Sequence, residues 1–414
     1  MSKQAIKKLV PELRFPEFRD AGEWEEKQLR QVGALVSGLT YSPNDVREEG
    51  LLVLRSSNVQ NGEISLNDCV YVTHDIKGAN LVMPNDILIC VRNGSKSLIG
   101  KNTIIPEGLP ISTHGAFMTI FRAPSSKFVY QLFQTQAYKN QVNADLGATI
   151  NSINGSHFIK YKFYVPNLPE QQKIADCLSS IDELITAQAQ KIDALKTHKK
   201  GLMQQLFPAE GENLPNLRFP EFRDAGKWES KSINDFCKTF SGGTPSTSEK
   251  GFYGGNIPFI RSAEIDKNQT ELFLTCEGLA NSSAKLVKKG DVLVALYGAN
   301  SGDVALAKLD GAINQAILCL KSDDSNRFIY QYLCLKEDWI VSTYIQGGQG
   351  NLSGEIIKSV RLGFPSKREQ QKIADCLSSI DELIAVQTQK LAALKTHKKG
   401  LMQQLFPSAD EVAG

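Results

Sequence analysis

The chain has 414 residues, of which 41% are hydrophobic and 22% charged, and its formal net charge is +2 at pH 7. This length favours two or more domains, and the composition is that of a folded globular protein rather than a disordered one. The small net charge excludes a strongly basic chain, although a local basic patch can still bind nucleic acid.

The first residues and the cysteines favour a protein of the cytoplasm. Residues 1–15 lack the apolar core of a signal peptide, and no run of about 18 apolar residues predicts a membrane span. The eight cysteines are scattered and form no C-x-x-C pair, which favours free thiols in a reducing compartment. We therefore expect a cytoplasmic protein without a membrane partner.

Two segments of the chain occur twice. VPELRFPEFRDAGEW at 10–24 returns as LPNLRFPEFRDAGKW at 214–228, and residues 170–208 return at 369–407 with five substitutions in 39 positions. The interiors, roughly 30–168 and 234–368, barely resemble each other. This pattern predicts two tandem halves in which one scaffold carries two different domains. Recent duplication of the edges, or drift of the interiors, is the alternative.

The first interior predicts an α/β domain, residues 1–168, with short strands. The β-rich run ILICVR (87–92) is followed by the turn residues Asn93 and Gly94. Its loops carry side chains suited to DNA, because Arg can contact guanine, Asn can contact adenine, and Ser and Lys can contact phosphates. The candidates are Arg55, Ser57, Asn58, Arg92, Asn93, Lys96, Asn151 and Asn154. For any one of them, a solvated loop residue is the alternative.

The repeated segments predict two long helices, 169–208 and 369–408. Apolar residues recur in alternating steps of four and three, a 3.5-residue period typical of a coiled coil. The predicted seam is Ile174, Leu178, Ile181, Ile185, Gln188, Ile192 and Leu195 in the first helix and Ile373, Leu377, Ile380, Ile384, Gln387, Leu391 and Leu394 in the second. Antiparallel pairing would relate the halves by an approximate twofold axis. A helix packed only on its own domain is the alternative.

The second interior predicts a second domain, residues 209–368, with matching landmarks in the same order, and a short tail (409–414) follows the second helix. DVLVAL (291–296) precedes Tyr297-Gly298, and NLSGEIIKSVRLGFP (351–365) corresponds to SINGSHFIKYKFYVP (152–166), so we expect both domains to share a fold. The candidate DNA contacts are Thr244, Arg261, Ser262, Tyr297, Asn300, Asn314, Gln315, Gln349 and Asn351.

Catalytic patterns are missing from the sequence. None of the five histidines has metal-ligand spacing, and no G-x-G-x-x-G follows a predicted strand. We therefore expect a chain that is not an enzyme and that binds neither a metal nor a cofactor. A fused nuclease or methyltransferase, and a coiled-coil adaptor without DNA readout, are the competing interpretations.

The chain resembles the specificity subunit of type I restriction–modification systems. The resemblance rests on both LRFPEFRDAG segments, SGGTPST (241–247), GDVLVALYGANSG (290–302), INQAILCL (313–320), GGQGNLS (347–353) and PEQQKIADCLSSIDELI with its second copy. It implies two target-recognition domains, each reading half of an asymmetric, interrupted site in double-stranded DNA. It also implies that the paired helices set the gap and dock two methyltransferase subunits, which the restriction and translocase subunits join. S-adenosylmethionine, ATP and Mg would then lie on the partner subunits.

Overall fold

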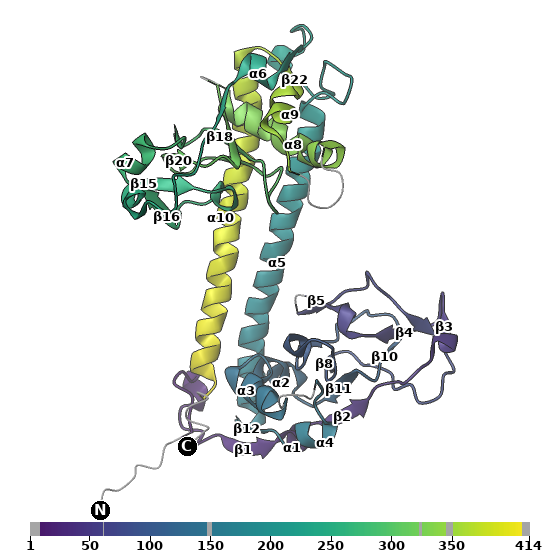
Figure 1. The fold of residues 1–414 in the computed structure, drawn as a ribbon. Coiled ribbons are helices and arrows are strands. Elements are labelled where there is room, and N and C mark those ends of the chain that lie inside the picture. Colours follow the sequence, from purple (N-terminus) through teal and green to yellow (C-terminus); the bar gives the residue numbers. More distant parts are fainter. Residues whose placement is uncertain (1–8, 61, 147–150, 323–324, 345–350, 408–414) are drawn as a thin grey trace, which may run out of the picture. The chain divides into compact units, whose positions relative to one another are not determined.

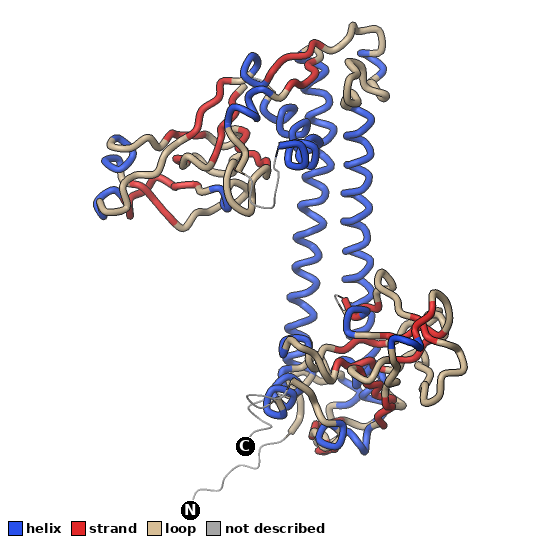
Figure 2. The backbone as a smooth tube through the Cα atoms, turned by 45° about the vertical axis from the view of Figure 1, so that its right-hand side comes forward, coloured by secondary structure: helices blue, strands red, loops and turns tan. Residues whose placement is uncertain are grey.

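A computed structural model describes residues 9–60, 62–146, 151–322, 325–344 and 351–407 of the chain. The chain forms two compact units: unit 1 consists of residues 1–188 and 390–414, and unit 2 of residues 189–389. Each unit therefore combines one α/β domain with parts of both long helices, whereas the sequence suggested consecutive domains and helices along the chain. Figure 2 shows the strands gathered in the two domains and the long helices beside them.

Domain 1, residues 25–165, belongs to unit 1 and is built mainly from two four-stranded sheets. The sheet orders are β10-β4-β7-β3 and β2-β11-β8-β9, with the smaller pairs β1-β12 and β5-β6. The strands are β1 (Glu25–Gln28), β2 (Ala34–Ser37), β3 (Val46–Arg47), β4 (Leu51–Leu54), β5 (Val59–Gln60), β6 (Glu63–Ile64), β7 (Tyr71–Val72), β8 (Ile87–Cys90), β9 (Asn102–Ile104), β10 (Ser112–His114), β11 (Met118–Arg122) and β12 (Lys162–Val165). The helices are α1 (Leu29–Val32), α2 (Ser126–Leu132), α3 (Gln136–Asp145) and α4 (Gly155–Phe158).

Domain 2, residues 229–364, belongs to unit 2 and also has two four-stranded sheets. Their orders are β14-β21-β18-β19 and β16-β15-β20-β17, with the pair β13-β22. The strands are β13 (Glu229–Ser232), β14 (Lys238–Ser241), β15 (Tyr253–Ile260), β16 (Leu272–Leu274), β17 (Lys285–Val287), β18 (Val292–Ala295), β19 (Val304–Leu306), β20 (Gly311–Ile313), β21 (Ile317–Lys321) and β22 (Arg361–Phe364). The helices are α6 (Ile233–Phe236), α7 (Cys276–Ala280), α8 (Asn326–Tyr344) and α9 (Gly354–Ser359).

The two domains share one topology despite their divergence. In each, an antiparallel sheet has the same order, β2-β11-β8-β9 or β14-β21-β18-β19, and the second sheet contains one parallel pair, β4 with β10 or β15 with β20. They differ at the sheet edge, because β3 pairs with β7 in domain 1 whereas β17 pairs with β20 in domain 2. The predicted α/β fold with a tandem repeat is confirmed.

The long helices are α5 (Leu168–Leu206) and α10 (Lys367–Leu405), each unbroken over 39 residues (Figure 1). Their bounds agree within three residues with the ranges predicted from the 3.5-residue period. A side chain caps the start of each helix: Asn167 Oδ1 accepts a hydrogen bond from Glu170 N at 3.0 Å, and Ser366 Oγ accepts one from Glu369 N at 3.4 Å. These bonds satisfy amide groups that the helix itself leaves unpaired.

The helices pair antiparallel inside each unit. In unit 1, Ile174 and Leu178 near the start of α5 share a hydrophobic cluster with Leu405 and Phe406 at the end of α10. Unit 2 repeats the arrangement with the roles exchanged, since Met203, Leu206 and Phe207 at the end of α5 share a cluster with Ile373 and Leu377 near the start of α10. The end of each helix is therefore anchored in the core of the other half's domain.

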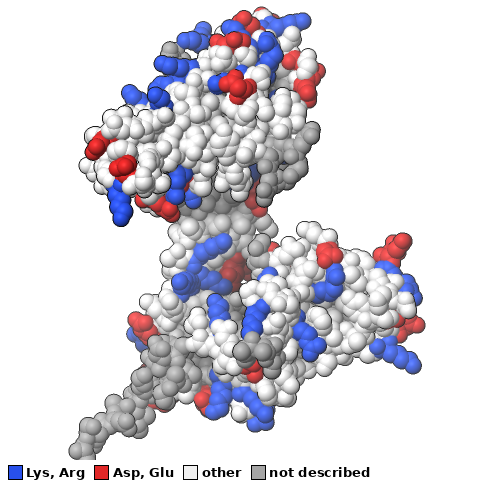
Figure 3. All heavy atoms as spheres, viewed as in Figure 1, with Lys and Arg blue, Asp and Glu red and all other residues white. Residues whose placement is uncertain are grey.

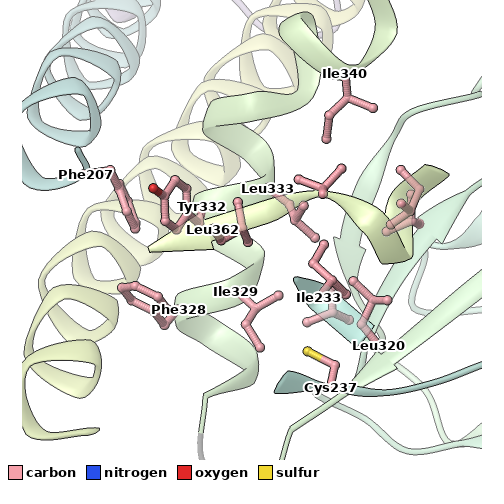
Figure 4. Packing of buried hydrophobic residues seen from close by; sticks show 14 of the residues in the cluster. Phe207, Ile233, Cys237, Leu320, Phe328, Ile329, Tyr332, Leu333, Ile340 and Leu362 are labelled. Carbon is pink, nitrogen blue, oxygen red and sulfur yellow. The ribbon is translucent and has the colours of Figure 1, made fainter. Parts of the chain in front are cut away.

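Aromatic rings form these anchors. Figure 4 shows Phe207 beside Tyr332 and Phe328 of α8, at centroid distances of 4.3 and 5.4 Å. In unit 1, Phe406 lies 5.7 Å from Phe128 and 6.1 Å from Trp24. Burial of such rings contributes a large share of the hydrophobic stabilisation of a core.

A charged network also joins the two helices and the domain in each unit. In unit 1, Lys398 Nζ of α10 lies 2.7 Å from both carboxylate oxygens of Asp182 on α5, and Gln131 of α2 donates to the same carboxylate at 2.8 Å. In unit 2, Lys199, Asp381 and Gln331 repeat these bonds at 2.7–2.8 Å. Each network thus fixes three elements around one aspartate.

The repeated LRFPEFRDAG segment clamps the start of each helix. Arg14 forms two hydrogen bonds to the buried carboxylate of Glu170 at 2.8 and 2.7 Å, and Leu13 N donates to Gln404 O. Arg218 holds Glu369 in the same way, with both distances 2.7 Å. Charge-assisted, two-pronged contacts of this kind are strong and geometrically specific. The segment repeated at the edges of the two halves therefore makes the same arginine–glutamate contact with a long helix in both units.

We expect Arg218→Ala to destabilise unit 2, because it leaves the Glu369 carboxylate, 1% exposed, without its cation. Loss of one partner from a buried ion pair costs about 3–5 kcal/mol. Urea unfolding followed by hydrogen exchange at the start of α10 measures the loss. The neighbouring pair of Lys372 with Glu221 is about half exposed, so Lys372→Ala is the matched control with little effect. Equal losses for both variants would contradict the clamp.

Candidate nucleic-acid interface

Three predicted loops of domain 1 meet beyond the end of β8. Asn93 donates through Nδ2 to Ser56 Oγ at 3.1 Å, and Asn93 N donates to Asn151 O at 3.4 Å. The Asn151 side chain donates back to Gly94 O at 3.3 Å. The loops around Arg55, Arg92 and Asn151, far apart in the sequence, therefore form one polar surface.

Arg92 is the most prominent side chain of this surface. It is exposed, and its guanidinium lies 5.6 Å from the ring centroid of Phe117, which is itself 57% exposed. In the sequence, Phe117 has no distinguishing signal beyond being a lone aromatic residue before β11. An exposed ring beside an arginine can contact both a base edge and a thymine methyl group.

The other domain 1 candidates differ in accessibility. Ser57, Lys96, Asn151 and Asn154 are exposed, and Asn93 is half-buried. The Asn154 Oδ1 accepts hydrogen bonds from Ser156 N and Ser156 Oγ at the start of α4. Arg55 is tied to Asp68 by an ion pair of 2.8 Å. Among these residues, only the exposed side chains can reach a base without a rearrangement.

The structure corrects the prediction that Asn58 contacts DNA. It is fully buried, its Nδ2 donates to Ser65 O and Asp68 O at 2.9 Å, and its Oδ1 accepts from Arg55 N at 2.9 Å. With these bonds it holds the loop together and presents no atom to DNA. The predicted DNA contact at this position is therefore replaced by a structural role.

In domain 2, the loops around Thr244, Tyr297 and Asn314 also meet. Thr244 Oγ1 donates to Gln315 Oε1 at 2.7 Å, Leu296 N donates to Ala316 O at 2.8 Å, and Leu352 N donates to Leu296 O at 2.9 Å. Thr244, Gln315, Asn351 and Tyr297 are exposed, the last by 39%. Asn314 is half-buried and accepts from Ala316 N, and Gln349 lies outside the described residues.

Arg261 is held by two carboxylates rather than free. It donates from Nε and Nη2 to Glu264 at 3.0 Å and from Nη2 to Glu271 at 2.6 Å. Ser262 and Asn300 line an adjoining hollow of about 380 Å³, where Asn300 donates to Asp303 at 2.7 Å. Burial, with the nearby Asp303, raises the pKa of Glu337 in the same hollow. This part of the surface therefore carries several carboxyl groups beside the predicted DNA contacts, which the loop sequences around Arg261 and Asn300 did not indicate.

The bonds around Glu264 lower the pKa of its carboxyl group. Burial alone would raise that pKa, but hydrogen bonds from the Arg261 guanidinium and from the amides of Glu271 and Arg261 hold it at about 2, below the usual 4.5. The turn after β15 therefore keeps its ion pair in all but strongly acidic solution.

The predicted seam residues lie along the pairing helices with different burial. The buried positions are Ile174, Leu178, Ile181, Gln188, Ile192, Ile373 and Leu377. The half-buried positions are Ile185, Leu195, Ile380, Ile384, Gln387, Leu391 and Leu394. Further along each helix, the apolar series is interrupted by Lys199 in α5 and by Lys398 in α10. These two lysines form the lysine–aspartate pairs between the helices.

The face of the molecule drawn in Figure 3 carries charges of both signs. On the face drawn in Figure 3, Lys and Arg side chains are interspersed with Asp and Glu and form no single basic face. Among the described residues, no group of three or more His, Cys, Asp or Glu side chains is placed to hold a metal ion. Within the same residues, the helices are too short or too polar to cross a membrane.

The Glu264 pKa gives a pH-dependent prediction. Because the folded pKa of about 2 lies below the usual 4.5, the stabilisation is present above about pH 4.5 and is lost as the pH falls toward 2. The difference in unfolding free energy between the wild type and Glu264→Gln should be constant near neutral pH and shrink in acid. Urea unfolding across this range measures it, with Glu249→Gln, an exposed site, as control. A difference that persists at pH 2 would contradict the assignment.

Comparisons with known proteins place the chain in a family. The sequence profile of the type I restriction modification DNA specificity domain matches residues 21–197 and again 225–396. The chain is 26% identical over 405 residues to the MjaX type I restriction enzyme specificity subunit of Methanocaldococcus jannaschii, covering 93% of each. It is 24% identical over 388 residues to the EcoKI specificity subunit of Escherichia coli K12, covering 87% of this chain and 82% of that one.

Solved structures show the same fold. The crystal structure of a type I restriction–modification S subunit from M. genitalium superposes with a TM-score of 0.64 at 15% identity, covering 96% of this chain and 99% of that one. A chain from a study of complex assembly in the type I system gives a TM-score of 0.53 at 17% identity, covering 93% and 98%. Because the family profile matches both halves and most of the length, the chain belongs to the type I restriction–modification DNA specificity family.

Proposed function

We propose that this chain is the DNA-recognition subunit of a type I restriction–modification complex and that each domain reads one half of an asymmetric, bipartite site in double-stranded DNA. The observation that carries the proposal is the contrast between the two loop surfaces. One topology presents Arg92 and Phe117 in domain 1 but Tyr297 and Gln315 in domain 2. Different side chains at equivalent strand ends favour different bases, so the two half-sites are unlike.

The paired helices supply the constant gap between the half-sites. Both α5 and α10 are unbroken and contribute residues to both units. In each unit, the lysine–aspartate–glutamine network fixes the domain to both helices at once. Helix length then determines the number of base pairs between the halves, the same geometric logic by which dimeric proteins read spaced half-sites.

The same helices dock two methyltransferase subunits. Their outward-facing residues match between the copies, as shown by Leu184, 56% exposed, and Leu383, 41% exposed, at the same position of the repeat. Exposed leucines contribute nothing to the core of the chain, and exposed apolar patches commonly mark binding surfaces. Two copies of one surface fit two copies of one partner.

Catalysis belongs to the partners in this proposal. The chain itself is non-catalytic, the methyltransferase subunits bind S-adenosylmethionine, and the restriction and translocase subunits, which join through them, use ATP and Mg. The near-neutral charge of +2 supports such a division, since the partners supply part of the grip on the phosphates.

We expect Arg92→Ala to relax discrimination in one half-site and Gln315→Ala to relax it in the other. A good bidentate contact to a base contributes about 1–3 kcal/mol, so the preference at the affected position falls about 5- to 150-fold. Methylome sequencing of a host that expresses each variant with its methyltransferase subunit measures this. Glu23→Ala, at an exposed site directly after the LRFPEFRDAG segment, is the control. Relaxation of both halves by either variant would refute the two-domain assignment.

The gap should follow helix length. Seven residues inserted after Gln188 in α5 and seven after Gln389 in α10 extend both helices at the boundary between the units. Repeating residues 182–188 and 383–389 keeps the heptad, and the added length is about 10 Å, or about three base pairs. Methylome sequencing should show the same two half-sites with a longer gap. An unchanged gap with full methylation would rule out helix length as its determinant.

A further inference from the structure

Each unit contains an open hollow where its domain meets the first turns of a long helix. Hollow 1, of about 440 Å³, is lined by Asp86, Arg122, Lys127, Phe128 and Gln172 among others. Hollow 2, of about 590 Å³, is lined by Lys289, Lys308, Arg327, Phe328 and Gln371 among others. Neither hollow belongs to the loop surfaces assigned to DNA.

The two hollows occupy equivalent places in the fold. Asp86, just before β8, accepts from Met83 N at 2.8 Å and pairs with Arg122 at the end of β11 at 2.7 Å. Beside hollow 2, Asp291 just before β18 accepts from Lys288 N at 2.9 Å. It pairs with Lys321 at the end of β21 at 3.6 Å. An aspartate–cation pair at the same place in the fold therefore lines hollow 1 and lies next in sequence to Gly290 and Ser322, which line hollow 2.

The helix side of each hollow is identical between the copies. Gln172 and Ala175 of α5 correspond to Gln371 and Ala374 of α10, in the segment where the two copies have the same sequence. Ala175 and Ala374 are both 2% exposed, so the floor beside the glutamines is apolar. Whatever binds hollow 1 thus meets the same helix face at hollow 2.

The domain side carries an outward cation in both copies, within the similar stretches SSKFVYQ (125–131) and SNRFIYQ (325–331). Lys127 and Arg327 are exposed and directly precede the buried Phe128 and Phe328. The phenylalanines are needed by the core, but the fold does not require a positive charge before them. By contrast, residues 83–85 are Met-Pro-Asn, whereas residues 288–290 are Lys-Lys-Gly. A retained charge at an exposed position points to a binding role.

That cation is available to a ligand. Among the described residues, Lys127 and Arg327 have no ion-pair partner, whereas Arg122 and Lys321 are matched by aspartates. None of the described residues that line hollow 2 is acidic, and Asp323 and Asp324 lie outside the described residues. A carboxylate is the complementary group, since it pairs with both lysine and arginine.

The surroundings favour a protein ligand over a phosphate backbone. Hollow 1 also contains Met83, which is 51% exposed, beside Pro84 and Pro124, and hollow 2 contains Leu306. A phosphodiester has no apolar group to bury against these side chains, whereas a peptide segment can place an apolar residue there and a carboxylate on the cation.

We propose that each hollow receives an acidic side chain from a segment of the methyltransferase subunit, once in unit 1 and once in unit 2. This inference rests on the proposed function. It names the contact through which the two methyltransferase subunits are held to the two domains. It explains why a charge persists at one exposed position of two domains whose recognition loops differ. One partner surface then docks twice, irrespective of the half-site that each domain reads.

The experiment measures how many methyltransferase subunits the full-length chain binds. Native mass spectrometry of the purified proteins should give two subunits for the wild type, one for Lys127→Glu, one for Arg327→Glu and none for the double variant at the same concentration. Isothermal titration calorimetry should show a loss of at least about tenfold in affinity at each changed hollow. Lys77→Glu and Lys250→Glu, exposed sites elsewhere in the two domains, are the matched controls and should keep two subunits.

The alternative outcomes are distinct. Two subunits bound with undiminished affinity by the double variant would overturn the inference while leaving the proposed function intact. If the variants instead bound DNA more weakly and kept both subunits, the hollows would hold phosphates. A wild-type chain that bound no methyltransferase subunit would overturn the proposed function itself. Lys127→Arg should behave as the wild type, because a cation of either kind pairs with the carboxylate.

Discussion

The pairing of α5 with α10 depends on a lysine placed where a coiled-coil seam would otherwise carry an apolar residue. Lys199 and Lys398 are 13% and 14% exposed, and each is satisfied only where an aspartate of the other helix faces it. Removing a charge from water costs several kcal/mol, so a register without that aspartate is disfavoured. Because Gln131 and Gln331 bind the same aspartates, helix register and domain position are fixed together.

This constraint explains why the chain repeats its edges and not its interiors. Each copy of the helix carries one aspartate and one lysine of the two networks, and each copy of the LRFPEFRDAG segment carries one clamp arginine. A single sequence therefore satisfies both units. The recognition loops take no part in these contacts, so their side chains are free to differ and to read different bases.

The sequence predicted what depends on local pattern and missed what depends on distant contacts. The 3.5-residue period located both long helices, and equivalent landmarks predicted one fold for both domains. Asn58 is a polar loop residue of the kind that can contact DNA. In the structure, its side chain is instead bound by carbonyl groups seven and ten residues further along the chain. Arg261 is tied to Glu271 across a turn, and the contact of Arg92 with Phe117 joins two segments that are distant in the sequence. Antiparallel pairing of the helices was predicted, but the burial of each helix end in the core of the other half's domain was not.

The most direct test is the methylome of a methylation-free host that expresses this chain with its methyltransferase subunit. The account predicts one motif made of two unlike half-sites separated by a constant number of unspecified base pairs. A continuous motif, or two identical half-sites, would contradict the assignment of one half-site to each domain. Complete absence of methylation from a stable complex of the two proteins would contradict DNA recognition and favour a coiled-coil adaptor.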